Sequence, residues 1–347
     1  MGNFEPKPAE EFSFKDITYE KKDYVATVAI NRPEVFNAYS ITALREMAQA
    51  FKDASWDDSI AVVVMTGTGD KAFCTGGDVK EYADNYTAKP RDFWKWMGDY
   101  NLAHDYLRNC GKPTIARVNG VVAGGGNEFH MSCDLSIAAE HADILQVGTR
   151  VGSVAAGGAT QFLPIIVGDR RAREILYLCE RIPAKKAMDW GLVNEVVPSV
   201  KSPDGEFVSF DDRKEMKKAL KEGGHTIDLS KLDEALDRMV AKLVDKFPEC
   251  MRYTKQQVNF WKDLSWYQTI GHAKDWLAVH FASYEPWEGM KAFVEKRETG
   301  YKKLRDLAAE GKSSEFVWGP YAKECGKCGA KGIPEMFEYC GKCGEKL

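Results

Sequence analysis

The sequence predicts an α/β core, followed by a helical region and a small metal-binding segment near the C-terminus. Three observations carry this prediction. Strand and helix patterns alternate through residue 200, helical patterns rich in aromatic residues follow, and four of the nine cysteines lie close together near the end of the chain. Repeated alternation of strands with helices is typical of an α/β domain.

The α/β core is expected to span residues 16–200. Short β-branched or continuous apolar runs bounded by turn residues predict its strands, which are residues 24–30, 60–65, 113–118, 135–139 and 193–197. A helix is expected after Ser40, because the following apolar residues fall on one helical stripe and Ser40 is a suitable N-cap. A second helical pattern covers residues 171–182.

Composition changes after Pro198. Residues 201–229 are rich in charge and glycine, so we expect a charged insertion or loop there. Residues 230–312 show helical periodicity and several tryptophans, which we assign to a core or to a subunit interface. Residues 320–347 hold the clustered cysteines and form the expected metal-binding segment.

Bulk composition excludes some classes of partner. The chain has 347 residues, of which 44% are hydrophobic, and this is enough for a sizeable core. Its formal net charge of −4 shows no basic surplus, so no nucleic acid is expected as a partner. Residues 1–15 are polar and lack the apolar run of a signal peptide, and no apolar run reaches transmembrane length. We therefore expect a cytoplasmic protein with no membrane contact, in which the scattered cysteines stay reduced.

Two glycine-rich segments are the strongest candidates for chemistry. Residues 72–81 follow one predicted strand and residues 119–128 follow another. Glycine allows a sharp turn and close approach of a ligand to backbone amides, and the amides at a helix N-terminus favour negative charge. Neither segment carries the signature of a phosphate loop or of a dinucleotide fingerprint.

Together with several shorter motifs, these segments resemble the enoyl-CoA hydratase (crotonase) superfamily. The motifs are Asn31-Arg32-Pro33 with Asn37-Ala38, Phe73 to Asp78, Gly124-Gly125-Gly126, Cys133-Asp134-Leu135, and Trp190 to Asn194. The resemblance covers residues 20–200. It implies a crotonase-like ββα spiral core, a C-terminal helical region that builds trimers, and a homotrimer or homohexamer. It also implies an acyl-CoA substrate, with coenzyme A as part of that substrate.

The resemblance further implies an oxyanion hole, in which two backbone N–H groups hold the enolate oxygen of a thioester. The family motifs place the first N–H at Gly77 and the second at Gly125. One such donor is worth on the order of 10²–10³ in rate. The other residues implied to bind the substrate or its coenzyme A are Val35, Phe36, Ala38, Thr75, Gly76, Asp78, Val79, Tyr82, Gly124, Gly148 and Ser153. The phenol of Tyr82 could donate to a second substrate carbonyl, and packing is an equal alternative.

Glu128 is the predicted catalytic carboxylate. It follows the glycine triplet closely, at a position where the family often carries a catalytic glutamate. It could act as a general base on water or as an acid toward the enolate carbon. The alternative is a glutamate that only favours the positive end of a helix. Ordinary hydratases carry a second glutamate, and that position is Gly148 here.

The absence of that second glutamate resembles a subset of the family that handles cyclic or dicarbonyl substrates. Several segments are most similar to the ring-opening 6-oxocyclohex-1-ene-1-carbonyl-CoA hydrolases. Those hydrolases carry an aspartate just before a Gly-Gly pair, where this chain has Ala156. The expected activity is therefore hydration of a conjugated, cyclic enoyl-CoA with hydrolytic ring opening. Plain enoyl-CoA hydration, double-bond isomerisation and a non-catalytic acyl-CoA-binding or RNA-binding scaffold are the alternatives.

The C-terminal cysteines form two Cys-x-x-Cys-Gly knuckles, made by Cys325 with Cys328 and by Cys340 with Cys343. Four thiolates suit a tetrahedral Zn²⁺ ion, and the short spacer suits a ribbon hairpin. Since all four positions are filled by protein, we expect a structural zinc ribbon. Iron and a pair of disulfides are the alternatives, and disulfides conflict with a cytosolic setting.

Overall fold

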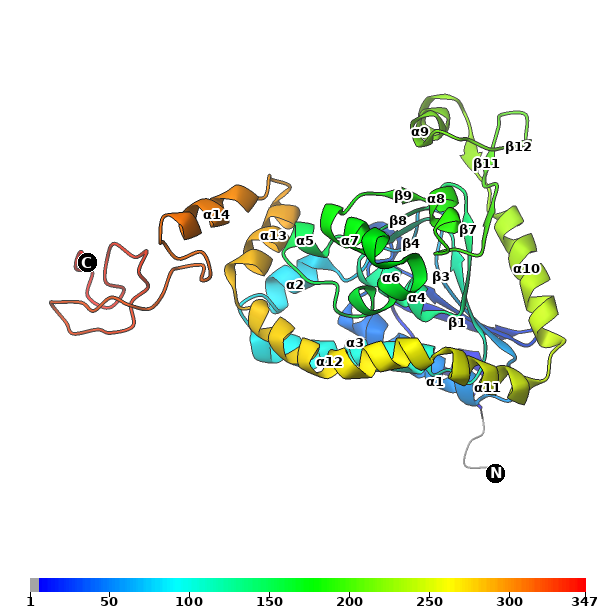
Figure 1. Ribbon diagram of the computed structural model, residues 1–347, viewed down its shortest axis with the longest axis horizontal. Helices are drawn as coiled ribbons and strands as arrows, with labels where there is room; N and C mark the ends of the chain where they lie inside the picture. Colours follow the sequence, from blue (N-terminus) through cyan, green and yellow to red (C-terminus); the bar gives the residue numbers. More distant parts are fainter. Residues whose placement is uncertain (1–5) are drawn as a thin grey trace. The chain divides into compact units, whose positions relative to one another are not determined.

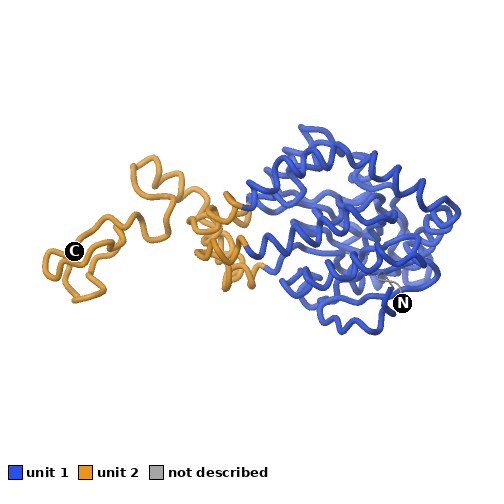
Figure 2. Tube along the Cα trace, turned by 90° about the horizontal axis from the view of Figure 1, so that it is seen from below, with its two compact units in different colours: residues 1–78, 95–149, 154–274 blue, residues 79–94, 150–153, 275–347 orange. Residues whose placement is uncertain are grey.

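The computed structural model describes residues 6–347, so the first five residues of the polar N-terminal segment lie outside the described range. The chain divides into two compact units (Figure 2). The first unit comprises residues 1–78, 95–149 and 154–274, and the second comprises residues 79–94, 150–153 and 275–347. Among the described residues, no helix has the length and apolarity that crossing a membrane requires.

A six-stranded sheet forms the centre of the first unit (Figure 1). Its order is β1 (Ile17–Lys22), β2 (Val25–Ile30), β3 (Val62–Gly67), β5 (Thr114–Val118), β7 (Leu135–Ala139) and β10 (Glu195–Val197). Strands β1 and β2 are antiparallel, and all later neighbours are parallel. Leu232 and Ala235 of helix α10 (Ser230–Val244) pack on the apolar residues of β3, β5 and β7. The predicted strands are thus present, and their apolar runs line this core.

A second sheet has the order β4 (Ala72–Cys74), β6 (Val121–Ala123), β8 (Asp143–Leu145) and β9 (Ile182–Pro183). Its first three strands directly follow β3, β5 and β7 along the chain, and helices α2 (Val79–Asn85), α4 (Gly125–Ser132) and α5 (Gly148–Val151) follow them in turn. The fold therefore repeats a strand–strand–helix unit. Each glycine-rich segment lies at the second turn of such a unit, between a short strand and a helix.

The remaining helices surround these sheets or continue the chain (Figure 1). They are η1 (Ala9–Glu11), η2 (Pro33–Val35), α1 (Ile41–Trp56), α6 (Ala159–Val167), α7 (Asp169–Leu178), α8 (Ala184–Asp189) and α11 (Pro248–Val258). Helices α3 (Pro90–Arg108) and α12 (Phe260–His280) each contribute residues to both units. Ser40 caps α1 as predicted, because its Oγ accepts a hydrogen bond from the Ala43 amide at 3.0 Å.

The charged insertion is not a bare loop. Residues 201–229 carry helix α9 (Arg213–Glu222) and complete a small sheet of order β12 (Phe207–Val208), β11 (Val200–Lys201) and β13 (Thr226–Ile227). The buried Glu140 carboxylate anchors the insertion, since its Oε1 accepts the Phe210 amide at 2.9 Å and pairs with Lys185 at 2.8 Å. Met216 of α9 is buried as well. Polar contacts between residues far apart in the sequence leave no trace in local hydrophobic periodicity. For this reason the sequence did not predict the helix and the short strands of this insertion.

The second unit contains α2, α13 (Tyr284–Glu295), α14 (Tyr301–Ala309) and the cysteine-rich segment. Within it, the rings of Phe93 and Phe281 stack at 3.5 Å, and Tyr82 packs edge-on against both. The region 230–312 is helical, as expected, from α10 to α14. Beyond α14 the backbone forms two isolated antiparallel bridges, Lys323 with Ile333 and Tyr339 with Lys346.

Candidate active site

The two glycine-rich loops of the first unit meet at their backbones. Gly76 has a φ of +96° and Gly124 a φ of +53°, which are conformations that glycine adopts without strain. A Cβ atom on Gly76 would lie only 3.1 Å from both the Ala123 carbonyl oxygen and the Gly125 nitrogen. The absence of side chains therefore allows the loop after β4 to touch the loop after β6.

Gly77 and Gly125 occupy equivalent places in these two loops. Both are partly accessible, whereas the neighbouring Gly76, Gly124 and Gly126 are buried. Among the described residues, neither amide donates a hydrogen bond to another protein group. The Gly125 amide also belongs to the first residue of α4, where backbone N–H groups are not used within the helix. Two uncommitted, accessible donors on touching loops can hold one developing oxyanion.

Two buried asparagines hold the chain that leads into the first loop. The Asn37 Nδ2 donates to the carbonyl oxygens of Thr68 at 3.0 Å and Ala72 at 2.7 Å. The Asn119 Nδ2 donates to the carbonyl oxygens of Gly67, at 2.8 Å, and Ala72, at 3.1 Å. These hydrogen bonds join the turn between β3 and β4 to Asn37 and Asn119. Because the Gly77 loop follows that turn and β4, the bonds also help to fix its position.

Glu128 lies one helical turn into α4 and is 5% exposed. Its Oε2 accepts the Tyr100 hydroxyl at 2.5 Å, and its Oε1 accepts the Ala159 amide at 3.2 Å. Burial raises the pKa of this carboxyl to about 7, although the hydrogen bonds from Tyr100 and from the Ala159 and Gly157 backbone act to lower it. A carboxyl group with a pKa near neutrality can both accept and return a proton, and this suits general acid–base chemistry.

Aromatic rings enclose Glu128 and the second glycine loop. Tyr39, Trp96, Tyr100 and Phe129 are all buried and form one contiguous cluster. A Cβ atom on Gly125 would lie 1.9 Å from the Tyr39 hydroxyl oxygen, so this phenol touches the oxyanion-hole candidate. Tyr39 and Tyr100 were not singled out from the sequence, because they precede the glycine motif in the chain and carry no motif of their own.

His104 and His130 also lie within this buried layer, and neither has the features of a proton donor. Burial and the nearby Arg108 charge hold the pKa of His104 well below its usual range. Burial, with a smaller contribution from Lys262, lowers the pKa of His130 to about 4. The His104 ring stacks on Phe129 at 3.8 Å.

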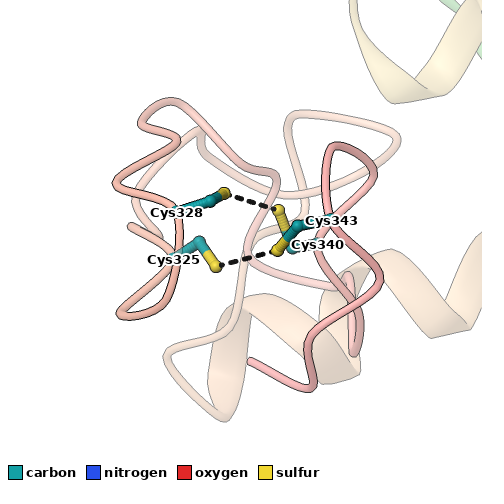
Figure 3. A group of neighbouring side chains, drawn as sticks. All are labelled: Cys325, Cys328, Cys340 and Cys343. Atoms are coloured by element: carbon teal, nitrogen blue, oxygen red, sulfur yellow. Dashed lines mark hydrogen bonds between the residues drawn. The ribbon is translucent and has the colours of Figure 1, made fainter.

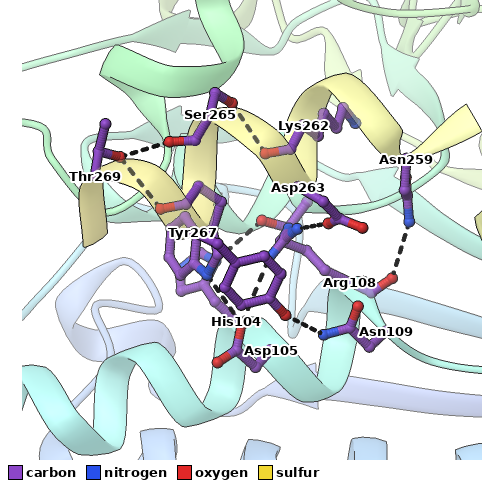
Figure 4. Close-up of polar contacts among 12 residues, drawn as sticks. His104, Asp105, Arg108, Asn109, Asn259, Lys262, Asp263, Ser265, Tyr267 and Thr269 are labelled. Carbon is purple, nitrogen blue, oxygen red and sulfur yellow. Dashed lines mark hydrogen bonds and ion pairs between the residues drawn. The ribbon is translucent and has the colours of Figure 1, made fainter. Parts of the chain in front are cut away.

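A polar network joins α3 to α12 behind this layer (Figure 4). The buried Arg108 guanidinium pairs with Asp263 and lies over the ring of Trp266. The Trp266 indole N–H donates to Asp105 at 3.0 Å. Since α3 carries both Tyr100 and His104, this network orients the helix that faces Glu128.

Gly148 and Ala156 bring no carboxylate to the site. Gly148 is the first residue of α5, and Ala156 is 2% exposed. The Ala156 carbonyl oxygen accepts the side-chain amide of Gln161 at 2.8 Å. Within the first unit, Glu128 is therefore the carboxylate beside the second glycine loop, whereas Asp78 of the first loop pairs with Arg32.

The structure brings together the predicted residues of the early motif and the first glycine loop. The Thr75 hydroxyl donates to the Phe36 carbonyl oxygen at 3.1 Å. Arg32 donates to the Ala38 carbonyl oxygen at 2.7 Å and to Asp78 at 3.0 Å. These contacts join residues 35–38 to residues 75–78, and Val35 and Phe36 lie on this surface with partial or full exposure.

Three predicted binding residues, Val79, Tyr82 and Ser153, belong to the second unit. Val79 begins α2, and Tyr82 lies one turn further along. The Tyr82 ring packs 6.1 Å from the ring of Tyr86. Within this unit, packing of the Tyr82 ring is thus observed.

The four C-terminal cysteines converge as predicted (Figure 3). Their Sγ atoms lie within 4.8 Å of one another, with 3.6 Å between Cys325 and Cys343 and 3.7 Å between Cys328 and Cys340. Sulfurs at about 2.3 Å from a tetrahedral zinc are about 3.8 Å apart, so these spacings fit such an ion. Backbone N–H groups lower the pKa of Cys325 and of Cys340, which favours thiolates at these two positions, whereas the neighbouring cysteines raise the pKa of Cys343.

Comparison with known proteins agrees with this arrangement. Residues 20–208 match the family model described as enoyl-CoA hydratase/isomerase. The chain is 36% identical to a 6-oxocyclohex-1-ene-1-carbonyl-CoA hydrolase from Geobacter metallireducens, over 90% of this chain and 87% of that protein. It is 34% identical to a protein of the same name from Thauera aromatica, over 89% of this chain and 87% of that protein. The crystal structure of an enoyl-CoA hydratase/isomerase from Xanthobacter autotrophicus Py2 superposes with a TM-score of 0.67 at 25% identity, covering 86% of this chain and 97% of the other.

Proposed function

The chain belongs to the enoyl-CoA hydratase/isomerase family, and from this premise we propose that it hydrates a cyclic, conjugated enoyl-CoA thioester and then opens the ring by hydrolysis. The observation that carries this proposal is the similarity, over most of both chains, to the two ring-opening hydrolases. The buried Glu128 beside two touching glycine loops supplies the chemistry that such a reaction needs.

Hydration uses the oxyanion hole and one carboxylate. The amides of Gly77 and Gly125 hold the thioester oxygen, on which negative charge develops as water adds to the conjugated double bond. Glu128 takes a proton from that water and returns it to the carbon next to the thioester. Because its pKa is about 7, both protonation states are populated near neutrality.

Ring opening requires a second water. This water gives a proton to Glu128 and adds to the ring ketone of the substrate. The bond between the ketone carbon and the carbon next to the thioester then breaks, and the ketone carbon becomes a carboxylic acid. The electron pair of that bond passes to the thioester as an enolate, which the same two amides hold, and protonation of the enolate carbon completes the step. Glu128 is the carboxylate that we assign to both steps, because Ala156 provides none.

Ala156 favours a second candidate function. Without a carboxylate at that position, the enzyme could stop after water addition, as a plain hydratase, or shift a double bond with Glu128 alone. These reactions share the enolate and the oxyanion hole and differ in the number of waters gained.

Coenzyme A binding is assigned to the joined surface of residues 35–38 and 75–78 of the first unit, with contributions from Gly124 and Gly148 of the same unit. The contacts from Thr75 to Phe36 and from Arg32 to Ala38 and Asp78 give this surface a fixed backbone. A fixed backbone lowers the entropic cost of ordering a long ligand.

We also propose a structural Zn²⁺ ion held by Cys325, Cys328, Cys340 and Cys343, within a ribbon of residues 320–347. The sulfur spacings support it. The proposed organisation has a spiral core of residues 16–200, an insertion of residues 201–229 and a trimer-forming helical region of residues 230–312. A cytoplasmic homotrimer or homohexamer without nucleic acid completes the proposal.

Mass spectrometry of products formed in ¹⁸O-labelled water tests the proposed function. Wild-type protein incubated with 6-oxocyclohex-1-ene-1-carbonyl-CoA is expected to yield a ring-opened thioester that has gained two waters. Glu128→Gln keeps the shape of the side chain and is expected to abolish this gain. A gain of one water identifies a hydratase, and no turnover by wild-type protein rejects this substrate.

A further inference from the structure

Tyr100 makes the shortest polar contact to the predicted catalytic carboxyl group. Its hydroxyl donates to Glu128 Oε2 at 2.5 Å and also lies 3.2 Å from the Gly157 carbonyl oxygen. A Cβ atom on Gly157 would lie 2.3 Å from the Tyr100 ring, so the phenol rests directly on the loop that carries Ala156. The ring is fixed by stacking on Trp96 at 5.3 Å and by edge contact with Phe129 at 5.7 Å.

We propose that Tyr100 is a positioning residue for Glu128, whose hydroxyl reverses its hydrogen bond when Glu128 gains or loses a proton. This inference rests on the proposed function and deepens it. Nothing in the sequence motifs marks Tyr100, and its role follows from the two oxygen atoms within reach of one phenol.

The hydrogen-bond pattern differs between the two protonation states of Glu128. When Glu128 is a carboxylate, the Tyr100 O–H donates to Oε2. When Glu128 is a carboxylic acid, its own O–H donates to the Tyr100 oxygen, and the phenol proton turns to the Gly157 carbonyl oxygen. The phenol keeps its proton throughout, and the buried carboxyl group keeps this hydrogen bond in either state. An unsatisfied buried polar group would destabilise the folded protein.

Few other groups act on this pair within the first unit. The elements packed on α4 present the titratable groups Tyr39, Cys74, His104 and Lys262, and α4 itself carries His130. Lys262 donates to the Met131 carbonyl oxygen at 3.0 Å, and burial lowers the pKa of His130 to about 4. His104 is neutral, since burial and the Arg108 charge depress its pKa, and burial raises the pKa of the Cys74 thiol to about 12. From α6, the uncharged backbone of Ala159 faces Glu128. The charge of Glu128 is therefore balanced by hydrogen bonds, of which the one from Tyr100 is the shortest.

The test is Tyr100→Phe, which keeps the ring and removes the hydroxyl. The hydroxyl stabilises the charged carboxylate and lowers the pKa of Glu128, so its loss raises that pKa. We expect the acid limb of the kcat/KM profile to move up by about one to two pH units, and kcat to fall by about tenfold while KM changes little. Tyr106→Phe is the matched control, because six residues along the same helix it faces another direction.

A second measurement needs no substrate. Infrared titration of the protonated carboxyl band, assigned by its loss in Glu128→Gln, reports the pKa of Glu128 directly. It should rise in Tyr100→Phe, and a fluorinated tyrosine at position 100, a stronger donor, should lower it. Thermal unfolding verifies that each variant is folded.

Failure of the proposed function and failure of the Tyr100 inference give different experimental results. A wild-type protein that turns over no enoyl-CoA thioester counts against the proposed function. An infrared titration that is unchanged in folded Tyr100→Phe overturns the inference, whatever the activity. A fall in kcat with an unchanged pH profile also overturns it, because it would reduce Tyr100 to a packing role.

Discussion

At the scale of single residues, the oxyanion-hole candidate depends on the absence of a side chain at Gly125. The Tyr39 hydroxyl occupies the place where a Cβ atom would lie, at 1.9 Å, and the ring carbon Cζ lies 2.8 Å from it. Tyr39 is itself fixed by Phe129 and Trp96. Any substituent at Gly125 must therefore displace either the Tyr39 ring or the Gly125 amide that we assign to the oxyanion hole.

Gly125→Ala should accordingly reduce kcat by about 10²-fold, the effect of losing one well-placed oxyanion donor. The double variant with Tyr39→Phe removes the closest clashing atom and should recover part of that loss. Gly271→Ala in α12 is the control, because nothing lies within 4 Å of its added methyl group and alanine favours helix. The measurement is kcat from steady-state kinetics of the three variants. Full activity in Gly125→Ala would show that the Gly125 amide is not an oxyanion donor.

A sequence motif predicted some residues of the candidate site and missed others. Glu128 and Gly125 lie three positions apart, so one local motif marks both. Tyr100 lies 28 residues before Glu128 on another helix, and only tertiary packing brings its hydroxyl to the carboxylate. Local patterns therefore predict the groups that share a loop, and they miss partners supplied by a neighbouring helix.

At the scale of elements, the turn before the first glycine loop is held by the side chain of Asn37. This residue has a φ of +53°, and its Nδ2 satisfies two carbonyl oxygens while its Oδ1 accepts the Arg32 amide at 3.1 Å. The sequence motif marked Asn37 but could not show what it holds, since Thr68 and Ala72 are distant along the chain. These hydrogen bonds help to fix the position of the loop that carries Gly77.

Asn37→Ala should lower the free energy of unfolding by about 2–4 kcal/mol, because it leaves buried carbonyl groups unpaired and forces alanine into a left-handed conformation. Asn37→Gly loses the same hydrogen bonds without the backbone cost, so it should be about 1 kcal/mol more stable than Asn37→Ala. Urea unfolding measures both. The exposed Asn109→Ala serves as the control and should change stability by less than about 0.5 kcal/mol. Equal stability of the alanine and wild-type proteins would contradict the role given to Asn37.

At the scale of the whole molecule, strands with a local apolar pattern were predicted better than the insertion, which long-range polar contacts hold in place. Five of the six strands in the large sheet were predicted, because each contains a short apolar run. Strand β1 is polar and only partly buried, and the sequence did not predict it. Residues 201–229 were expected as a charged insertion or loop, and they carry a helix and short strands that Glu140 and Lys185 help to anchor. These contacts join residues that are far apart in the sequence. Composition does not reveal them, and the charge and glycine content of the segment therefore suggested that it is solvated.

The cysteine-rich segment should depend on metal for its structure, because the buried apolar cluster of residues 320–347 consists of Ile333, Cys325 and Cys340. We expect about one zinc per chain by elemental analysis, and a loss of that zinc in Cys325→Ser. Limited proteolysis should then cleave the C-terminal segment of the variant or of chelator-treated protein, while residues of the α/β core stay protected. Cys250→Ser, at an exposed cysteine on α11, is the matched control and should retain zinc and protease resistance. Iron in place of zinc would show as visible absorption, and protection that persists after complete metal removal would contradict a metal-dependent ribbon.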